Sequence, residues 1–465
     1  MRAGKITPFM KQQKPNRNEF NRRDFLKGSS AASFMTLLGG VELVMDRPSA
    51  KAVDAEKLHG PAVKSAVIGL GVQGRTIVST LARLPEAQVV ALCDTYPAAI
   101  RRASKDAPEA ASLNDYRQIL DNKEIKAVFI TTPSHLHRDI ALAALQADKH
   151  VYCEAPLAHT VEDARTIAKA AKGAVKQVFQ PGLQMRSDPH RHFLLTFIRS
   201  GAMGKTVVCR AQWHKKTSWR SAAPNAAREK DLNWRLERES SPGLAGEIGL
   251  HQYDVVSWFL NARPKAVSGF GGILQWNDGR EVPDTVQAVF EFPGGTNLIY
   301  EATLANSFDS EYEMFYGTDS AIMLRENKAW MFKEVDSPLL GWEVYARKDT
   351  FYKETGVALA ANATKLKAQG DKPVEEAPFT NTPLFYALEN FLTNVNQVSA
   401  AVEDFAATFS VSDQPALVKY LSDVKRQPAA GWKEGLESTV AILKANEAIL
   451  KGQKITFQKE WFDLG

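Results

Sequence analysis

Glu154 ends a short strand-like run and is the first residue whose type and place suggest chemistry. The stretch His-Val-Tyr-Cys-Glu-Ala-Pro, residues 150–156, is apolar up to Cys153 and then turns polar. Strand ends of this kind lie at the mouth of α/β active sites, where a carboxylate can bind hydroxyl groups or exchange a proton. Ala155, the next residue, can do neither.

His251 is the second candidate. In Gly-Glu-Ile-Gly-Leu-His-Gln-Tyr-Asp, residues 246–254, Glu247 precedes His251 by four positions and Asp254 follows it by three. On an α-helix Glu247 and His251 share a face, and a carboxylate one turn before an imidazole can fix its tautomer and raise its basicity. The spacing favours His251 as a base oriented by Glu247. The alternative is a structural histidine on a half-buried helix face.

A glycine-rich loop predicts a dinucleotide site, because a strand pattern precedes it and a helix pattern follows it. The first glycine would make a tight turn, the second would admit a pyrophosphate to the backbone, and the third would let the helix pack on the strand. The helix N-terminus would face the phosphates. The predicted loop comprises Gly69, Leu70, Gly71, Val72, Gln73 and Gly74.

Asp94 ends the next strand pattern, twenty residues after Gly74. Its carboxylate would accept hydrogen bonds from the adenosine ribose hydroxyl groups and repel a 2′-phosphate, which favours NAD. Arg101 and Arg102 lie nearby and keep NADP as the less favoured alternative.

The elements that must position these residues change character along the chain. From residue 64 to about 185, short apolar strands alternate with amphipathic helices, which predicts a doubly wound parallel sheet of the Rossmann type. After residue 200, consecutive strands separated by turn residues predict an α+β domain with a large, mostly antiparallel sheet. We expect an NAD-binding domain at 53–185 and a substrate domain with C-terminal helices at 186–465.

The N-terminal region has the pattern of a twin-arginine export signal. Arg22 and Arg23 precede a mildly apolar stretch at about 28–45, and Ala-Lys-Ala at 50–52 offers a cleavage site after Ala52. We therefore expect residues 1–52 to direct the protein to the periplasm or another extracytoplasmic site. A basic tail followed by a short helix is the alternative.

Charge and cysteine content exclude other classes. The chain carries a net charge of +5. Residues 1–27 carry a net charge of +6 and residues 28–52 a net charge of zero, so the rest of the chain carries −1. The folded body therefore gives no sign of a basic nucleic-acid surface. Three cysteines do not make a disulfide framework, and Cys93 and Cys153 lie in apolar strand patterns typical of buried thiols. His190 and His192 have no neighbouring ligand pattern, so no metal site is expected.

Taken together, these residues resemble the Gfo/Idh/MocA family of NAD(P)-dependent sugar oxidoreductases. The similarity covers about residues 64–455, through Gly-Leu-Gly-Val-Gln-Gly, Thr-Thr-Pro-Ser-His-Leu-His at 131–137, Cys-Glu-Ala-Pro at 153–156, Gly-Leu-Gln-Met-Arg at 182–186, and residues 246–254. The resemblance implies a carbohydrate substrate, His251 as the catalytic base, and a homodimer or homotetramer. It places next to the nicotinamide riboside Thr132, Pro133, His137 and Glu154. It adds Ala155 and Gln184 to the cofactor-binding residues, with Gln184 lining the passage between the domains. His137 could equally cap the following helix.

The resemblance also implies substrate contacts in the second domain. Arg186 would line the passage between the domains, and Asp254 completes the family's Asp-x-x-x-His-x-x-Asp pattern, in which Glu247 replaces the first aspartate. Trp219, in a polar loop, is the aromatic residue best suited to stack on a sugar ring.

Ala155 stands where the family has its catalytic lysine. The missing proton transfer would then fall to His251 or to another group, with Tyr253, His214, Lys215 and Lys216 as candidates. Family branches without this lysine include glycosidases, which oxidise a sugar carbon transiently, eliminate the aglycone, add water and return the hydride.

Export supports a redox-neutral cycle, because no free nicotinamide pool is expected outside the cytoplasm. The first expectation is a sugar oxidoreductase that keeps NAD(H) tightly bound. An NAD-dependent glycoside hydrolase is the alternative, and a non-catalytic NAD-binding protein is the third possibility.

Overall fold

The computed structural model describes residues 60–326, 328–340, 348–351, 354–358, 380–410 and 412–464. The predicted export signal, with its cleavage site, lies outside these residues. In the part of the chain that is described, no helix is long and apolar enough to cross a membrane.

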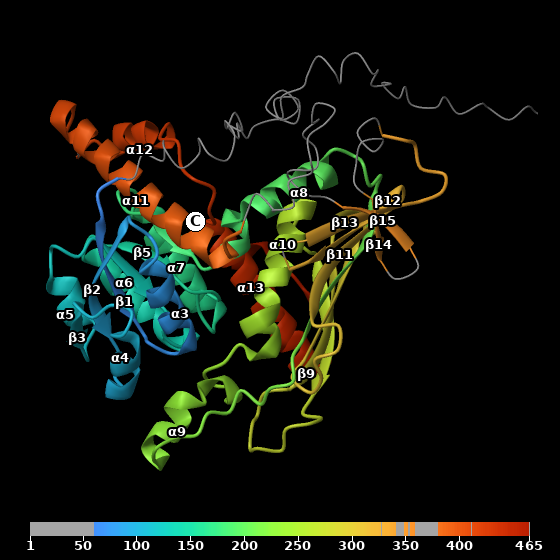
Figure 1. The fold of residues 1–465 in the computed structure, drawn as a ribbon, viewed down its shortest axis with the longest axis horizontal. Helices are drawn as coiled ribbons and strands as arrows, with labels where there is room; N and C mark the ends of the chain where they lie inside the picture. The colour runs from blue at the N-terminus through green and yellow to red at the C-terminus, as the bar shows by residue number, and fades with distance from the viewer. Residues whose placement is uncertain are drawn as a thin grey trace, which may run out of the picture. The chain divides into compact units, whose positions relative to one another are not determined.

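A six-stranded parallel sheet forms the first half of the fold, as predicted (Figure 1). Its strand order is β3-β2-β1-β4-β5-β6, with every neighbouring pair parallel. The central strands β4 and β5 are buried on both faces, which explains their unbroken apolar sequences. The strands are β1 (Val63–Ile68), β2 (Ala87–Cys93), β3 (Ala111–Leu113), β4 (Ala127–Ile130), β5 (His150–Cys153) and β6 (Phe179–Pro181).

Helices cover both faces of this sheet. One apolar core joins the sheet to α5, α6, α7 and α13, and a second joins its other face to α3, α4 and α11. The helices are α3 (Val72–Leu81), α4 (Pro97–Ala103), α5 (Arg117–Asp121), α6 (His137–Gln146), α7 (Val161–Gly173), α11 (Pro383–Thr408), α12 (Gln414–Ser422) and α13 (Trp432–Lys451). The late helices α11 and α13 thus pack against the parallel sheet, and the division at residue 185 stays a prediction.

A ten-stranded sheet forms the second half, in the order β14-β15-β13-β12-β11-β7-β10-β9-β8-β16. Only the β7–β10 pair is parallel, so the sheet is mostly antiparallel, as predicted. Its strands are β7 (Thr206–His214), β8 (Ala266–Gly272), β9 (Thr285–Glu291), β10 (Asn297–Thr303), β11 (Glu311–Gly317), β12 (Ser320–Arg325), β13 (Lys328–Lys333), β14 (Lys348–Phe351), β15 (Glu354–Ala358) and β16 (Ile455–Thr456).

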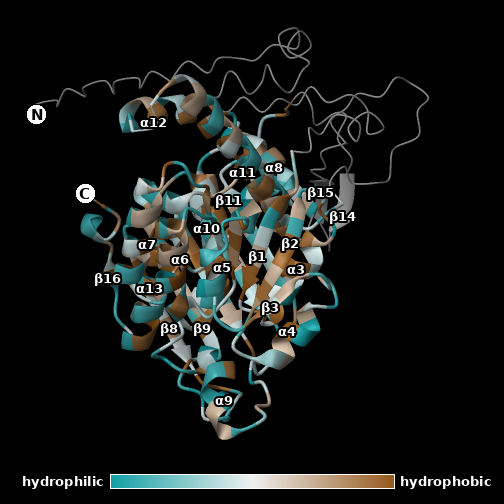
Figure 2. Ribbon diagram, turned by 90° about the vertical axis from the view of Figure 1, so that its left-hand side faces the viewer, coloured by the Kyte–Doolittle hydropathy of each residue, from teal (hydrophilic) through white to brown (hydrophobic). Residues whose placement is uncertain are grey.

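Helices α10 and α13 pack on the inner face of this sheet. The hydropathy colouring places apolar segments along the strands and on the helix sides that face them (Figure 2). The remaining helices are α8 (Pro189–Arg199), α9 (Ala226–Leu232) and α10 (Leu250–Leu260), with a π-helix η4 (Ala245–Gly249) and short 3₁₀ turns that include η2 (Gln184–Ser187). All three cysteines, Cys93, Cys153 and Cys209, are buried and unbridged, as expected for structural thiols.

Candidate functional site

The glycine loop has the room and the unpaired donors that a pyrophosphate needs. A Cβ atom on Gly69 would lie 2.8 Å from the backbone of Thr131, and one on Gly74 would collide with the carbonyl oxygen of Gly69. By contrast, a Cβ on Gly71 would meet nothing within 4 Å. Gly71 also caps α3 without a side-chain hydrogen bond, so the first N–H groups of the helix remain available to an anion. These features fit a dinucleotide.

Asp94 is held at the adenosine end of this loop. Its two carboxylate oxygens accept hydrogen bonds from the backbone N–H groups of Leu70 and Tyr96, each 2.7 Å long. These bonds orient the carboxylate beside the glycine loop, where an NAD ribose would lie. Arg101 and Arg102 are exposed on α4.

Glu154 lies at the end of β5, against the glycine loop. Gln73 donates a 2.9 Å hydrogen bond to Glu154 Oε1, and a Cβ atom on Gly182 would collide with Oε2. Burial raises the pKa of Glu154 to about 7, although the hydrogen bonds from Gln73 and from the Ala155 N–H oppose this shift. The neighbouring Ala155 brings no cation to favour the charged form.

His137 has a structural role. Its Nδ1 lies 3.1 Å from the Pro156 carbonyl oxygen and its Nε2 lies 2.9 Å from the Thr132 carbonyl oxygen, so the ring lies between the loops after β4 and β5 and its single N–H can donate to one of them. The side chain is 2% exposed, and burial lowers its pKa to about 4. The structure therefore favours the structural interpretation over a direct cofactor contact. Thr132 keeps a buried Oγ1 with no hydrogen-bond partner among the described residues.

The turn before His251 differs from the predicted α-helix. Glu247 lies in the π-helix η4, whose hydrogen bonds run from i to i+5, so residues four apart do not stack as they do on an α-helix. Glu247 Oε2 pairs instead with Arg235 Nε at 2.8 Å. Within the described part of the chain, Glu247 Oε1 and His251 Nδ1 are both buried without a hydrogen-bond partner. The predicted orientation of His251 by Glu247 is therefore absent.

These unpaired atoms define a reactive corner. Burial lowers the pKa of His251, while Asp254 opposes that shift, so the imidazole is neutral at neutral pH and can accept a proton. Burial also raises the pKa of Glu247, against the effect of Arg235.

Arg186 and Asp254 form an ion pair with each other. Arg186 donates to both oxygens of Asp254 over 2.9–3.1 Å, and the Ser438 hydroxyl adds a 2.8 Å bond. Asp254 is 1% exposed. The pair joins η2, where Gln184 also lies, to α10, and Ser438 ties it to α13. The structure thus places both predicted substrate contacts in a buried ion pair between η2 and α10.

Tyr253 and His214 do not reach the reactive corner. Tyr253 is 1% exposed and packs on Phe290 of β9, with ring centroids 4.9 Å apart. It faces the sheet because it lies two residues from His251, on another side of α10. His214 Nε2 lies 3.7 Å from Glu301. Successive side chains of a strand point to opposite faces of the sheet. Tyr300 faces Gly249 of η4, so the neighbouring Glu301 points to the outer face.

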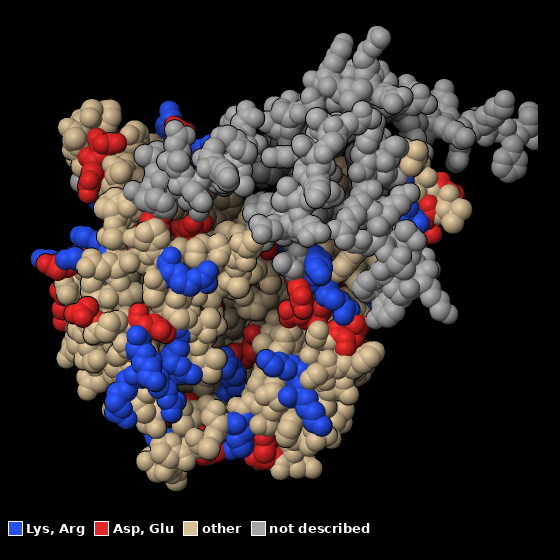
Figure 3. All heavy atoms as spheres, in the orientation of Figure 1, with Lys and Arg blue, Asp and Glu red and all other residues tan. Residues whose placement is uncertain are grey.

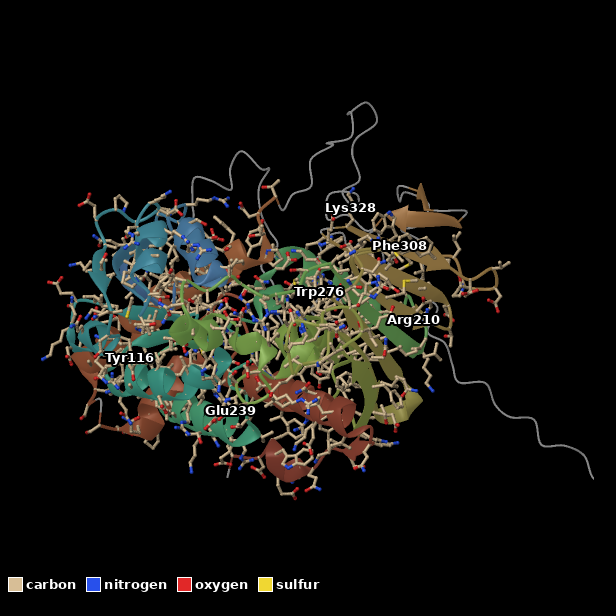
Figure 4. All side chains as sticks on the ribbon, turned by 90° about the horizontal axis from the view of Figure 1, so that it is seen from below. Tyr116, Arg210, Glu239, Trp276, Phe308 and Lys328 are labelled. Carbon is tan, nitrogen blue, oxygen red and sulfur yellow. The ribbon has the colours of Figure 1, made fainter. Side chains whose placement is uncertain are left out.

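Lys215 and Lys216 continue past the end of β7 and are exposed. Arg210 and Phe308 lie in the half of the fold that contains the ten-stranded sheet, away from Tyr116 of the nucleotide-binding half (Figure 4).

Aromatic side chains line the region beside Glu247. Arg235 lies over the rings of Trp234, at 4.9 Å, and Trp219, at 5.9 Å. Trp219 has a φ of +61°, a conformation that strains a bulky residue and is often found at functional sites. The Trp234 ring in turn meets His135, with centroids 6.0 Å apart. His135 precedes α6 and escaped the sequence analysis, although it lies within Thr-Thr-Pro-Ser-His-Leu-His.

A recess separates the two domains on the face shown in Figure 3, with basic and acidic side chains close together at its lower end. Groups of three or more His, Cys, Asp or Glu side chains that could hold a metal ion are absent from the described residues.

Comparisons with known proteins agree with this geometry. Residues 63–181 match the model of the oxidoreductase family with an NAD-binding Rossmann fold, GFO_IDH_MocA, and residues 194–322 match the C-terminal domain of the same family. Together the two models cover more than half of the chain. Inositol 2-dehydrogenase of Salmonella typhimurium is 28% identical over 51% of this chain and 66% of its own length. Levoglucosan dehydrogenase of Pseudarthrobacter phenanthrenivorans is 30% identical over 46% of this chain and 58% of its own length.

Both matched segments thus span less than two thirds of the length of these relatives.

Solved structures share the fold over most of the chain. Levoglucosan dehydrogenase in complex with NADH superimposes with a TM-score of 0.62 at 18% identity, covering 85% of this chain and 99% of its own. Aldose-aldose oxidoreductase from Caulobacter crescentus superimposes with a TM-score of 0.58 at 18% identity, covering 85% and 100%.

Proposed function

The chain belongs to the Gfo/Idh/MocA family of NAD-binding oxidoreductases, and on that premise we propose that it oxidises a carbinol carbon of a sugar with a retained NAD. When bound, NAD supplies a hydride acceptor and donor. The main support for this activity is the reactive corner, where His251 Nδ1 and Glu247 Oε1 are buried and have no hydrogen-bond partner among the described residues. Relatives named for inositol and levoglucosan support a polyhydroxylated substrate.

The residues have distinct tasks in this proposal. His251 accepts the hydroxyl proton of the substrate, because its imidazole is neutral and its Nδ1 is free. Glu247 accepts a hydrogen bond from a second sugar hydroxyl. Trp219 provides a face for the sugar ring. The glycine loop, Asp94 and Glu154 hold the cofactor, and the Arg186–Asp254 pair fixes α10 relative to η2.

We further propose that the overall cycle is redox-neutral and takes place outside the cytoplasm. The twin arginine at residues 22–23 supports export, and an exported enzyme must regenerate its cofactor within each cycle. A two-sugar cycle meets this need, and the name of the aldose-aldose oxidoreductase among the structural relatives describes such a pairing.

A second candidate function follows from Ala155. An alanine at the lysine position also suits an NAD-dependent glycosidase, which consumes no external cofactor. A non-catalytic NAD-binding protein would not need the free proton acceptor at His251.

One experiment separates these functions. The purified protein is incubated in deuterated water with aryl glycosides and with pairs of free sugars, without added NAD. A two-sugar oxidoreductase yields one oxidised and one reduced sugar only when both are present. A glycosidase releases the aglycone and gains deuterium beside the oxidised carbon. Oxidation only with stoichiometric added NAD, with NADH accumulating, would overturn the redox-neutral proposal.

A further inference from the structure

The segment between β7 and η4 includes a projecting loop, residues 221–233, that we name the arm. Two hydrogen bonds close it: the Ser221 N–H donates to Asn233 Oδ1 at 2.7 Å, and Asn233 Nδ2 donates to the Ser221 carbonyl oxygen at 3.1 Å. Asn233 is 3% exposed, so this closure is protected from water. The arm therefore leaves the second domain as a closed unit.

The base of the arm is fixed to the second domain. The N–H group of Glu281 donates to the Leu236 carbonyl oxygen at 2.8 Å, and Arg238 donates to Glu281 through its backbone and its side chain. Leu236 itself is 1% exposed.

Helix α9, within the arm, has no buried residue of its own. Hydrophobic packing thus does not hold it in place. Instead, Arg228 reaches the nucleotide-binding domain: its guanidinium lies 4.9 Å from the centroid of the Tyr96 ring, and Nη1 lies 3.5 Å from Thr95 Oγ1. Both views show α9 at the end of the molecule where α4 lies (Figures 1 and 2).

The contact lies at the adenosine corner of the cofactor site. Thr95 and Tyr96 directly follow Asp94, and the Tyr96 N–H donates to the Asp94 carboxylate. Just after the arm, Trp234 meets His135, which follows the predicted nicotinamide contacts Thr132 and Pro133. In a Rossmann domain the dinucleotide runs along the carboxyl edge of the sheet between these two corners. The segment therefore contacts the nucleotide-binding domain at both ends of that path.

We propose that Arg228 is a cofactor-retaining residue, supplied by the second domain to the adenosine end of NAD. Its Nε is buried and has no hydrogen-bond partner among the described residues, so it has a donor to offer. Its Nη1 also pairs with Asp231 at 3.1 Å, which holds the side chain along α9. NAD leaves only when the guanidinium separates from Tyr96. This inference rests on the proposed retention of NAD, but it predicts a separate observable.

The test is the dissociation rate of NADH, measured by displacement with excess NAD and loss of NADH fluorescence. Arg228→Gln should dissociate about tenfold faster than the wild type, since a partly desolvated cation–π contact is worth on the order of 1–2 kcal/mol. The matched control is Lys230→Gln, which removes the same charge from α9 at a side chain that pairs with Glu239. It should leave the rate unchanged and so exclude a general loss of attraction for phosphates.

Two further measurements locate the effect. ADP-ribose, which carries the adenosine end, should lose affinity in Arg228→Gln, whereas nicotinamide mononucleotide should not. Tyr96→Leu keeps the backbone donor to Asp94, and combining it with Arg228→Gln should add little to either single change. Equal rates for wild type and Arg228→Gln, or equal acceleration by Lys230→Gln, would overturn the role of Arg228. A wild type that binds no NADH would instead refute the proposed function.

Discussion

The Arg186–Asp254 pair offers a quantitative test of how η2 is held to α10. Asp254 is 1% exposed and receives three hydrogen-bond contacts from Arg186 and one from Ser438. Asp254→Asn preserves the shape but leaves the guanidinium of Arg186, 17% exposed, without its counter-charge. Breaking a buried pair from one side costs about 3–5 kcal/mol. That is a large fraction of the roughly 5–15 kcal/mol by which proteins are stable.

Urea unfolding of the nucleotide-free protein, followed by circular dichroism, measures this loss. Replacing both partners, as in Arg186→Met with Asp254→Leu, should recover much of it, because no buried charge is then left unpaired. Glu124→Gln breaks an exposed pair with Lys64 and should leave the transition unchanged. If Asp254→Asn costs less than about 1 kcal/mol but removes activity, then Asp254 faces the substrate after all.

Three other changes test the site itself. His251→Ala should lower turnover by about 10²–10⁴-fold with unchanged NAD content, measured by activity and by nucleotide released on denaturation; retained activity would make His251 structural. Gly71→Ala should weaken NADH binding at least about tenfold. It should leave the melting temperature of the nucleotide-free protein unchanged, because the new Cβ meets no protein atom within 4 Å. Gly74→Ala should lower that melting temperature, because its Cβ would collide with the carbonyl oxygen of Gly69. The fold raises the pKa of Glu154 from about 4.5 to about 7 and so favours its protonated form. The wild type should therefore lose stability relative to Glu154→Gln, on the order of 2 kcal/mol, as the pH rises between these values. A stability difference that does not depend on pH would contradict the shift.

The nucleotide-binding half could be predicted from sequence because its signals are local. Buried parallel strands are continuously apolar, and the glycine loop needs small residues at fixed spacing to make its turn and its helix contact. The same local reasoning predicted Asp94 beside the loop, where its carboxylate accepts a hydrogen bond from the Leu70 N–H group. The sheet of the second half was also recognisable, since each strand is bounded by turn residues.

The errors arose where a distant partner decides the role of a side chain. Helical spacing suggested that Glu247 orients His251, but the chain forms a π-helix there and Glu247 binds Arg235. Asp254 was predicted to contact the substrate because nothing in the neighbouring sequence indicates its ion-pair partner Arg186, which lies 68 residues earlier. Arg228 was missed for the same reason, since its partners Thr95 and Tyr96 lie 133 and 132 residues away in the other domain.

Ala155 bears on the charge of the neighbouring Glu154. A cation at this position would favour the charged form of Glu154, whereas alanine leaves burial to dominate, and the pKa stays at about 7. Burial acts in the opposite direction on His251, whose pKa is lowered. Below neutral pH Glu154 is therefore increasingly protonated, whereas His251 stays neutral to a lower pH than a free imidazole. The resemblance implies a lysine at residue 155, and with alanine there burial alone sets the direction of the pKa shift of Glu154.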